Sequence, residues 1–125
     1  MPAMICLLRH GDAEVETESG DAARKLTAKG QLQAASAGRA MAALGIAVEH
    51  CLTSPRVRAA DSAALACNAL GIRPEVVEAI GDGNYEADDL AAGRGTVLIV
   101  GHEPVLSIEV ARLTGARIKL KKGGL

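Results

Sequence analysis

The chain has 125 residues, a formal net charge of −1 and 49% hydrophobic residues, which suits one domain with a core of its own. Phe and Trp are absent and Tyr85 is the single aromatic residue, so the chain lacks the rings on which proteins stack single-stranded nucleic acid. Its charge also gives no basic footprint for a duplex, and no apolar stretch approaches the roughly 20 residues that span a bilayer. The N-terminus lacks the basic and apolar regions of a secretory signal, so we expect a cytoplasmic protein with no nucleic-acid or membrane partner.

The first predicted element is a buried strand at the apolar run 4–8. Residues 12–25 are polar and acidic with too little periodicity for a core element, and they predict a surface loop. Thr27 can cap a helix that extends to about residue 44, where Gly45 provides a C-terminal stop. A second strand is expected at 48–52.

The next predicted element is a helix over 55–70, because Ser54 suits its N-cap and Pro55 its first position. Residues 74–79 predict a short edge strand. Residues 81–84, with the sequence Gly-Asp-Gly-Asn, predict a turn.

A short helix at 87–92, a strong strand at 96–100 and a helix from Pro104 to about residue 113 complete the pattern. Strands separated by helices of this length predict an α/β fold, because parallel neighbours need a crossover connection. We expect three α/β/α layers, with a mostly parallel sheet flanked by helices.

Three cysteines, Cys6, Cys51 and Cys67, form an odd set without a Cys-x-x-Cys pair. The first two lie in strand-like runs and the third in a helical one. This pattern favours buried free thiols, and a metal site is the least favoured interpretation.

Polar clusters follow three of the predicted strands. They are Arg9-His10-Gly11, the segment 54–58 with Arg56 and Arg58, and the segment 101–104 with His102. Ligands of parallel sheets bind beyond the carboxyl ends of the strands, so we expect the clusters to meet at one edge. Imidazole and guanidinium groups together predict a pocket for a phosphoryl group, because Arg presents paired donors to phosphate oxygens.

The chain resembles the histidine phosphatase superfamily, with its phosphoglycerate-mutase-like fold, over nearly its whole length. The resemblance is closest to the small SixA-type phosphohistidine phosphatases. Four motifs occur in family order: Leu-Arg-His-Gly-Asp-Ala-Glu at 8–14, Arg-Lys-Leu-Thr-Ala-Lys-Gly at 24–30, Thr-Ser-Pro-Arg-Val-Arg-Ala at 53–59 and Val-Gly-His-Glu-Pro at 100–104. Four motifs together are far more specific than any one of them.

The resemblance implies a role for each matching residue. His10 is the expected nucleophile, transiently phosphorylated, and Arg9 and Gly11 contribute to phosphate binding. Arg58 is the expected pocket arginine because the family places it three residues after the proline, which leaves Arg56 at the entrance or in solvent. His102 is expected to donate to the phosphoryl oxygens. Arg24 corresponds to a family residue near the pocket and is equally well explained as part of a solvated charged face.

The general acid is open at the sequence level. Glu78 is the best candidate for this acid from its position in the family pattern, but it is explained at least as well as a solvated loop carboxylate without a catalytic role. Asp82, Glu86 and Glu103 are the alternative candidates. A phosphohistidine substrate makes less demand on an acid, because its leaving imidazole can take a proton from solvent on the other nitrogen. We therefore expect a phosphatase without cofactor or metal that acts on a phosphohistidine-containing protein such as a phosphotransfer domain. The alternatives are a small-molecule phosphomonoesterase and a non-catalytic module that binds phosphorylated ligands.

The family continues past the last helix into another strand, and residues 119–125 stop where that strand should start. We therefore expect one histidine phosphatase domain over 1–125 in a truncated or naturally abbreviated form. An unprotected edge favours pairing with a second copy, but the oligomeric state is not determined by the sequence.

Overall fold

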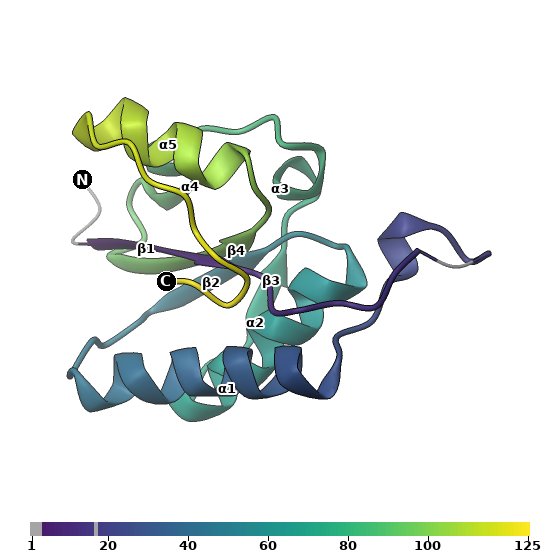
Figure 1. Cartoon of the computed structure of the whole chain (residues 1–125). Helices are drawn as coiled ribbons and strands as arrows, with labels where there is room; N and C mark the ends of the chain where they lie inside the picture. Colours follow the sequence, from purple (N-terminus) through teal and green to yellow (C-terminus); the bar gives the residue numbers. More distant parts are fainter. Residues whose placement is uncertain (1–3, 17) are drawn as a thin grey trace.

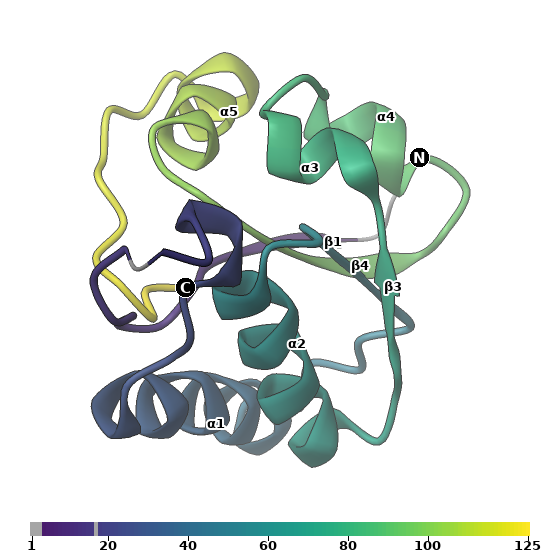
Figure 2. The same ribbon diagram turned by 90° about the vertical axis from the view of Figure 1, so that its right-hand side faces the viewer.

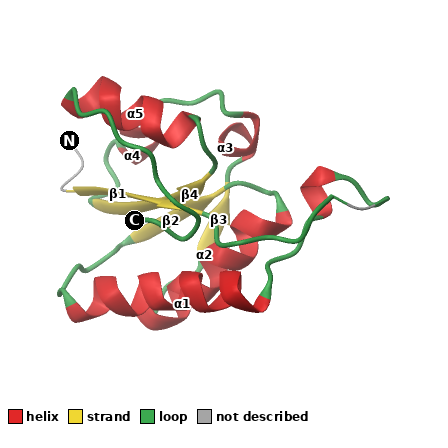
Figure 3. Ribbon diagram, viewed as in Figure 1, coloured by secondary structure: helices red, strands yellow, loops and turns green. Residues whose placement is uncertain are grey.

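The computed structural model describes residues 4–16 and 18–125, and these form three layers (Figure 1). A parallel sheet lies between one layer with α1 (Ala28–Ala43) and α2 (Val57–Leu70) and another with α3 (Glu78–Asp82), α4 (Ala87–Ala91) and α5 (Val105–Thr114). In the described part of the chain the strands are β1 (Met4–Arg9), β2 (His50–Thr53), β3 (Pro74–Val76) and β4 (Thr96–Gly101), in the order β1-β4-β2-β3 (Figure 3). The predicted α/β/α fold is confirmed.

The register of the sheet brings the strand ends together. Arg9 of β1 is level with Gly101 of β4, and Thr53 of β2 is level with Val100 of β4. The residues that follow these strands therefore leave the sheet at one edge, which is the edge that faces the viewer in Figure 2. This arrangement positions the three predicted polar clusters side by side.

Small residues allow α1 and α2 to pack closely beneath the sheet. A Cβ atom at Gly38 of α1 would lie 2.3 Å from the carbonyl oxygen of Ala66 in α2, so only glycine fits there. The core on this face combines alanines with Leu8, Met41 and other aliphatic residues, and all three cysteines are buried in it as free thiols, as predicted. An aliphatic core can thus be closely packed without Phe or Trp.

Several boundaries differ from the sequence prediction. α2 starts at Val57 rather than residue 55, because Arg56 at its N-cap is still extended. The predicted turn at 81–84 overlaps the end of the single-turn helix α3, which the sequence analysis missed. Buried Ile80 packs this turn against the sheet, and Gly83, with a φ of +72°, ends it. Tertiary packing therefore selects a helix in a segment whose local residues favour a turn.

Residues 12–16 and 18–25 project beyond the carboxyl ends of the strands and include a short 3-10 helix, η1 (Asp21–Ala23) (Figures 1 and 2). The segment after α5 crosses the outer edge of β1, where the Arg9 N–H donates to the Gly124 carbonyl (2.9 Å) and the Gly123 N–H donates to the His10 carbonyl (2.9 Å). Among the described residues, no helix has the length and apolar character needed to cross a bilayer.

Candidate active site

His10 follows β1 directly and is only 6% exposed. Its Nδ1 lies 2.7 Å from the carbonyl oxygen of Gly11. Because a carbonyl only accepts hydrogen bonds, this contact fixes the ring proton on Nδ1. Nε2 therefore keeps its lone pair and is the nucleophilic atom of the ring.

Gly11 holds the loop after β1 against both helices of the lower layer. Its N–H donates to Ser62 Oγ (3.0 Å), and that hydroxyl donates to the Arg58 carbonyl (2.7 Å), which ties the loop to α2. A Cβ atom on Gly11 would lie 2.4 Å from the carbonyl oxygen of Gly30 in α1. Glycine is thus required for the close approach that orients His10.

His102 follows β4, and its ring lies beside that of His10, with the ring centroids 5.2 Å apart and the planes inclined by 53°. Its Nε2 is 2.7 Å from the hydroxyl oxygen of Ser54, at the end of β2. Its Nδ1 is buried and has no hydrogen-bond partner among the described residues. The two imidazoles predicted to share a site are therefore neighbours.

Both imidazoles are neutral at physiological pH. Burial lowers the pKa of His10 from its ordinary 6.5 to about 4, with smaller contributions from Arg58, Arg9 and Arg24. Burial likewise lowers the pKa of His102 to about 3, assisted by His10 and Arg58. Desolvation is thus the largest cause of the low pKa of His10, ahead of its positive neighbours.

Arg58 and Arg9 each have a buried Nε–H without a partner among the described residues. Arg58 is 5% exposed, and its other nitrogens donate to the carbonyl oxygen (2.8 Å) and to Oδ2 (3.0 Å) of Asp21. The Nη1 of Arg9 donates to the Leu120 carbonyl (3.0 Å). Each guanidinium group is thus held through Nη atoms, while its Nε–H has no partner among the described residues.

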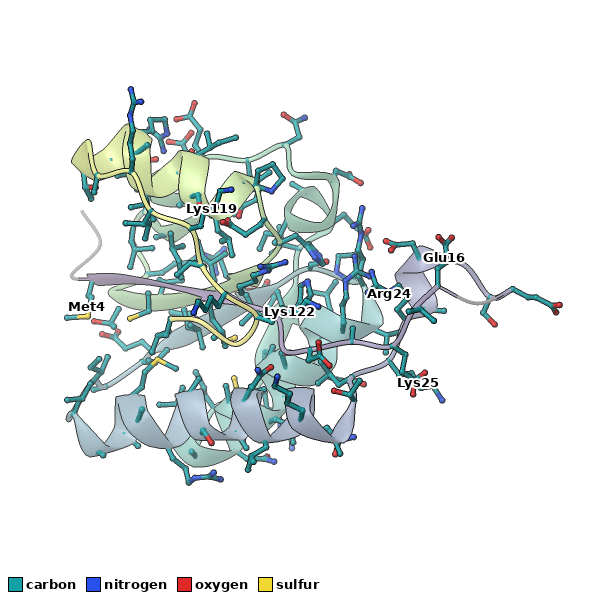
Figure 4. The ribbon with its side chains drawn as sticks, viewed as in Figure 1. Met4, Glu16, Arg24, Lys25, Lys119 and Lys122 are labelled. Atoms are coloured by element: carbon teal, nitrogen blue, oxygen red, sulfur yellow. The ribbon has the colours of Figure 1, made fainter. Side chains whose placement is uncertain are left out.

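Asp21 is the residue that sequence reasoning missed. Its carboxylate forms ion pairs with Arg24 (3.2 Å), Arg56 (3.5 Å) and Arg58 (3.0 Å). One acid therefore connects the two arginines predicted to bind phosphate, Arg24 and Arg58, with Arg56, which the resemblance leaves at the entrance or in solvent. Hydrogen bonds from Arg24 and Arg58 hold its pKa below the usual range. Figure 4 shows Arg24 on the loop beyond the strand ends, where the sequence offered only an aperiodic acidic stretch.

Among the described residues, no hydrogen bond or ion pair joins the carboxylates considered as general acids to His10, His102 or Arg58. Glu78 and Asp82 are exposed residues of α3. Glu86 pairs with Arg112 (3.4 Å), and Glu103 accepts hydrogen bonds from Ser107 at the start of α5. Among the described residues, acidic side chains close enough to share a metal ion occur together at 86–89, and two of these are ion-paired to Arg112.

Comparisons with known proteins agree with this geometry. Residues 5–89 match the family model of the histidine phosphatase superfamily (branch 1). An uncharacterized protein of Picosynechococcus sp. strain PCC 7002 is 31% identical over 136 residues, which cover 97% of this chain and 81% of the relative.

Two solved structures illustrate the shared fold. The protein histidine phosphatase SixA in complex with tungstate has a TM-score of 0.82 and 22% identity, covering 94% of this chain and 82% of its own. A mycobacterial glucosyl-3-phosphoglycerate phosphatase has a TM-score of 0.65 and 16% identity, covering 88% of this chain and 78% of its own. On the family match and the sequence relative together, the chain belongs to the histidine phosphatase superfamily.

Proposed function

We propose that the chain is a phosphatase that works through a phosphohistidine intermediate on His10. The observation that carries the proposal is a set of buried nitrogens without hydrogen-bond partners among the described residues, close to a neutral, oriented imidazole: Arg9 Nε–H, Arg58 Nε–H and Nδ1 of His102. Buried donors without acceptors are costly, and the oxygens of a phosphoryl group would satisfy them.

The reaction proceeds in two displacements. Nε2 of His10 attacks phosphorus, the bond from phosphorus to the leaving group breaks, and the phosphoryl group resides on His10. Water then attacks phosphorus, the Nε2–phosphorus bond breaks, and phosphate leaves with the oxygen and one proton of the water; the other proton goes to solvent. The guanidinium groups and His102 stabilise the charge on the equatorial oxygens in both steps. In this scheme the chain supplies the nucleophile and the groups that hold the phosphoryl oxygens, and solvent supplies the water and exchanges the protons.

We propose protein phosphohistidine as the substrate. Asp21 is held ionised by its arginine partners and is therefore a poor proton donor, and the other candidate acids are exposed or paired. An ester oxygen leaves badly without a proton, whereas the imidazole of phosphohistidine takes one from solvent at its second nitrogen. The connections that follow β2 and β4 are short, so on that side of the site little of the chain lies between a phosphorylated side chain of another protein and the strand ends.

A groove next to Arg9 supports a polypeptide substrate. It has a volume of about 870 Å³ and lies between α5 and the following segment, with Ile108 and Ile118 among its lining residues. The tungstate in the related SixA structure is a tetrahedral oxyanion, as phosphate is, and the SixA protein is a protein histidine phosphatase. A small phosphate ester is the competing substrate class, because another related structure is that of a glucosyl-3-phosphoglycerate phosphatase.

The test of the mechanism is to trap the intermediate. The protein is mixed with a radiolabelled phosphohistidine peptide, quenched in alkali after milliseconds and examined for protein-bound phosphate that is labile to acid. The wild type and the control His50→Ala, whose histidine is exposed at the start of β2, should carry the label, and His10→Ala should not. Equal clearance of substrate by His10→Ala and wild type would exclude His10 as the nucleophile.

The test of the substrate is a comparison of kcat/KM for the phosphohistidine peptide, p-nitrophenyl phosphate and sugar phosphates. We expect the highest value for the phosphohistidine peptide. A strong preference for the esters would replace the proposal with a small-molecule phosphomonoesterase. Phosphate affinity without turnover of any of these substrates would replace it with a binding module.

A further inference from the structure

Ser54 joins the carboxyl ends of two strands. It follows β2, is fully buried, and its hydroxyl oxygen lies 2.7 Å from Nε2 of His102, which follows β4. The sequence suggests Ser54 as the N-cap of α2, but that helix begins only at Val57. Ser54 Oγ instead accepts the N–H of Arg56 (3.1 Å), and its remaining hydrogen-bonding capacity is directed at His102.

The position of the hydroxyl proton follows from the partners of Ser54. A serine hydroxyl has one proton to donate and lone pairs to accept with. The Arg56 N–H is a donor and takes a lone pair, so it cannot receive the hydroxyl proton. Among the described residues, Nε2 of His102 is the hydrogen-bond partner of Ser54 Oγ that can receive this proton, and only if it does so is the buried hydroxyl proton satisfied. A ring nitrogen that accepts a hydrogen bond carries no proton of its own.

The tautomer of His102 matters because the ring is neutral. Burial and the neighbouring His10 and Arg58 hold the pKa of His102 at about 3, so at neutral pH the ring has a single N–H. If Nε2 accepts from Ser54, that proton is on Nδ1, the buried nitrogen that lacks a partner. The opposite tautomer would present a lone pair to the phosphoryl oxygens and repel them.

We propose that Ser54 is a positioning residue that selects the Nδ1–H tautomer of His102, so that this ring donates to the phosphoryl group. The inference rests on the proposed function for the identity of the ligand. The two rings of the site are then fixed by complementary devices. A carbonyl acceptor at Nδ1 of His10 frees Nε2 for attack, and a hydroxyl donor at Nε2 of His102 makes Nδ1 a donor.

Ring nitrogen NMR on protein labelled with ¹⁵N-histidine tests the proposal at neutral pH without substrate. The chain has three histidines, and the variants His10→Ala and His50→Ala assign their signals. We expect a protonated Nδ1 and an unprotonated Nε2 for His102 in the wild type. Ser54→Ala should move the ring largely to the Nε2–H form, and Ser54→Thr, which restores a hydroxyl, should reverse this. Thr53→Val is the matched control, because the buried hydroxyl of Thr53 donates to the Ser54 carbonyl and makes no hydrogen bond to His102.

Activity measurements give a second readout. Ser54→Ala should lower kcat for the phosphohistidine peptide by about tenfold, the effect of losing one hydrogen bond that biases the tautomer. Circular dichroism establishes that each variant is folded. A wild-type His102 with its proton on Nε2, or an unchanged tautomer in folded Ser54→Ala, overturns the proposal. Because the tautomer is measured without substrate, this outcome is distinct from a failure of His10 to form a phosphoenzyme.

Discussion

The desolvated His10 makes a quantitative prediction about acid stability. Burial lowers the pKa of this ring from 6.5 to about 4, whereas in the unfolded chain it titrates near its ordinary value. Between these values the unfolded chain binds a proton that the native protein excludes. The free energy of unfolding is therefore not reduced by His10 above pH 6.5, and it decreases as the pH falls from 6.5 toward 4.

The magnitude follows from the proton linkage. At pH 5 the unfolded ring is almost fully protonated and the native ring almost fully neutral. The free energy of unfolding falls by roughly 1.4 kcal/mol for each pH unit below 6.5. Over the interval of about 1.5 units down to pH 5, the protonation of His10 in the unfolded chain therefore lowers the free energy of unfolding by about 2 kcal/mol. The ring is 6% exposed, so screening by solvent reduces this only slightly.

Urea unfolding at pH 7 and pH 5 measures the effect. Circular dichroism of the helices is the suitable signal, because Trp is absent and Tyr85 is the single aromatic residue. The wild type should lose about 2 kcal/mol more than His10→Ala between the two pH values. His50→Ala, which removes an exposed histidine, should lose as much as the wild type. The same pH dependence in His10→Ala and wild type would refute the assignment of a buried neutral ring.

Further predictions concern the proposed phosphate ligands and the loop that holds His10, the proposed nucleophile. Arg58→Lys should reduce kcat/KM by roughly a hundredfold, because an ammonium cannot reproduce the fixed fork of donors, and a change below threefold would contradict its role. Asp21→Asn removes one negative charge from among three guanidinium groups, so the Kd for inorganic phosphate, measured by calorimetry, should fall several-fold. Weaker phosphate binding by this variant would mean that the carboxylate acts mainly by orienting the arginines. Gly11→Ala places a Cβ atom 2.4 Å from the carbonyl oxygen of Gly30 and should lower the free energy of unfolding in urea by about 1–3 kcal/mol. An unchanged unfolding midpoint would show that the loop can move to accommodate the extra atom. The pH profile of kcat/KM should lack a histidine ionisation between pH 5.5 and 7.5, since the pKa of His10 lies near 4, and a titration near 6.5 would show a solvated nucleophile.

The elements of the sheet were largely predictable because their signals are local. The apolar runs at 4–8 and 96–100 fall within β1 and β4, and Thr27 caps α1 by accepting the N–H of Gly30, as expected. α3 was not predictable, because its single turn depends on burying Ile80 against strands distant in sequence. Propensity within five residues is too weak to compete with such packing.

The sequence alone determined which residues follow each strand, and parallel pairing then required the Arg-His-Gly, Ser-Pro and Gly-His segments to share an edge. Tertiary structure alone decided what these residues do to one another. Asp21 reaches Arg58 across 37 positions and Ser54 reaches His102 across 48, and no local pattern encodes either contact. The physical reason is that strand ends and helix caps depend on neighbours within a few residues, whereas tautomers, pKa values and guanidinium orientation depend on whatever the folded chain brings within hydrogen-bonding distance.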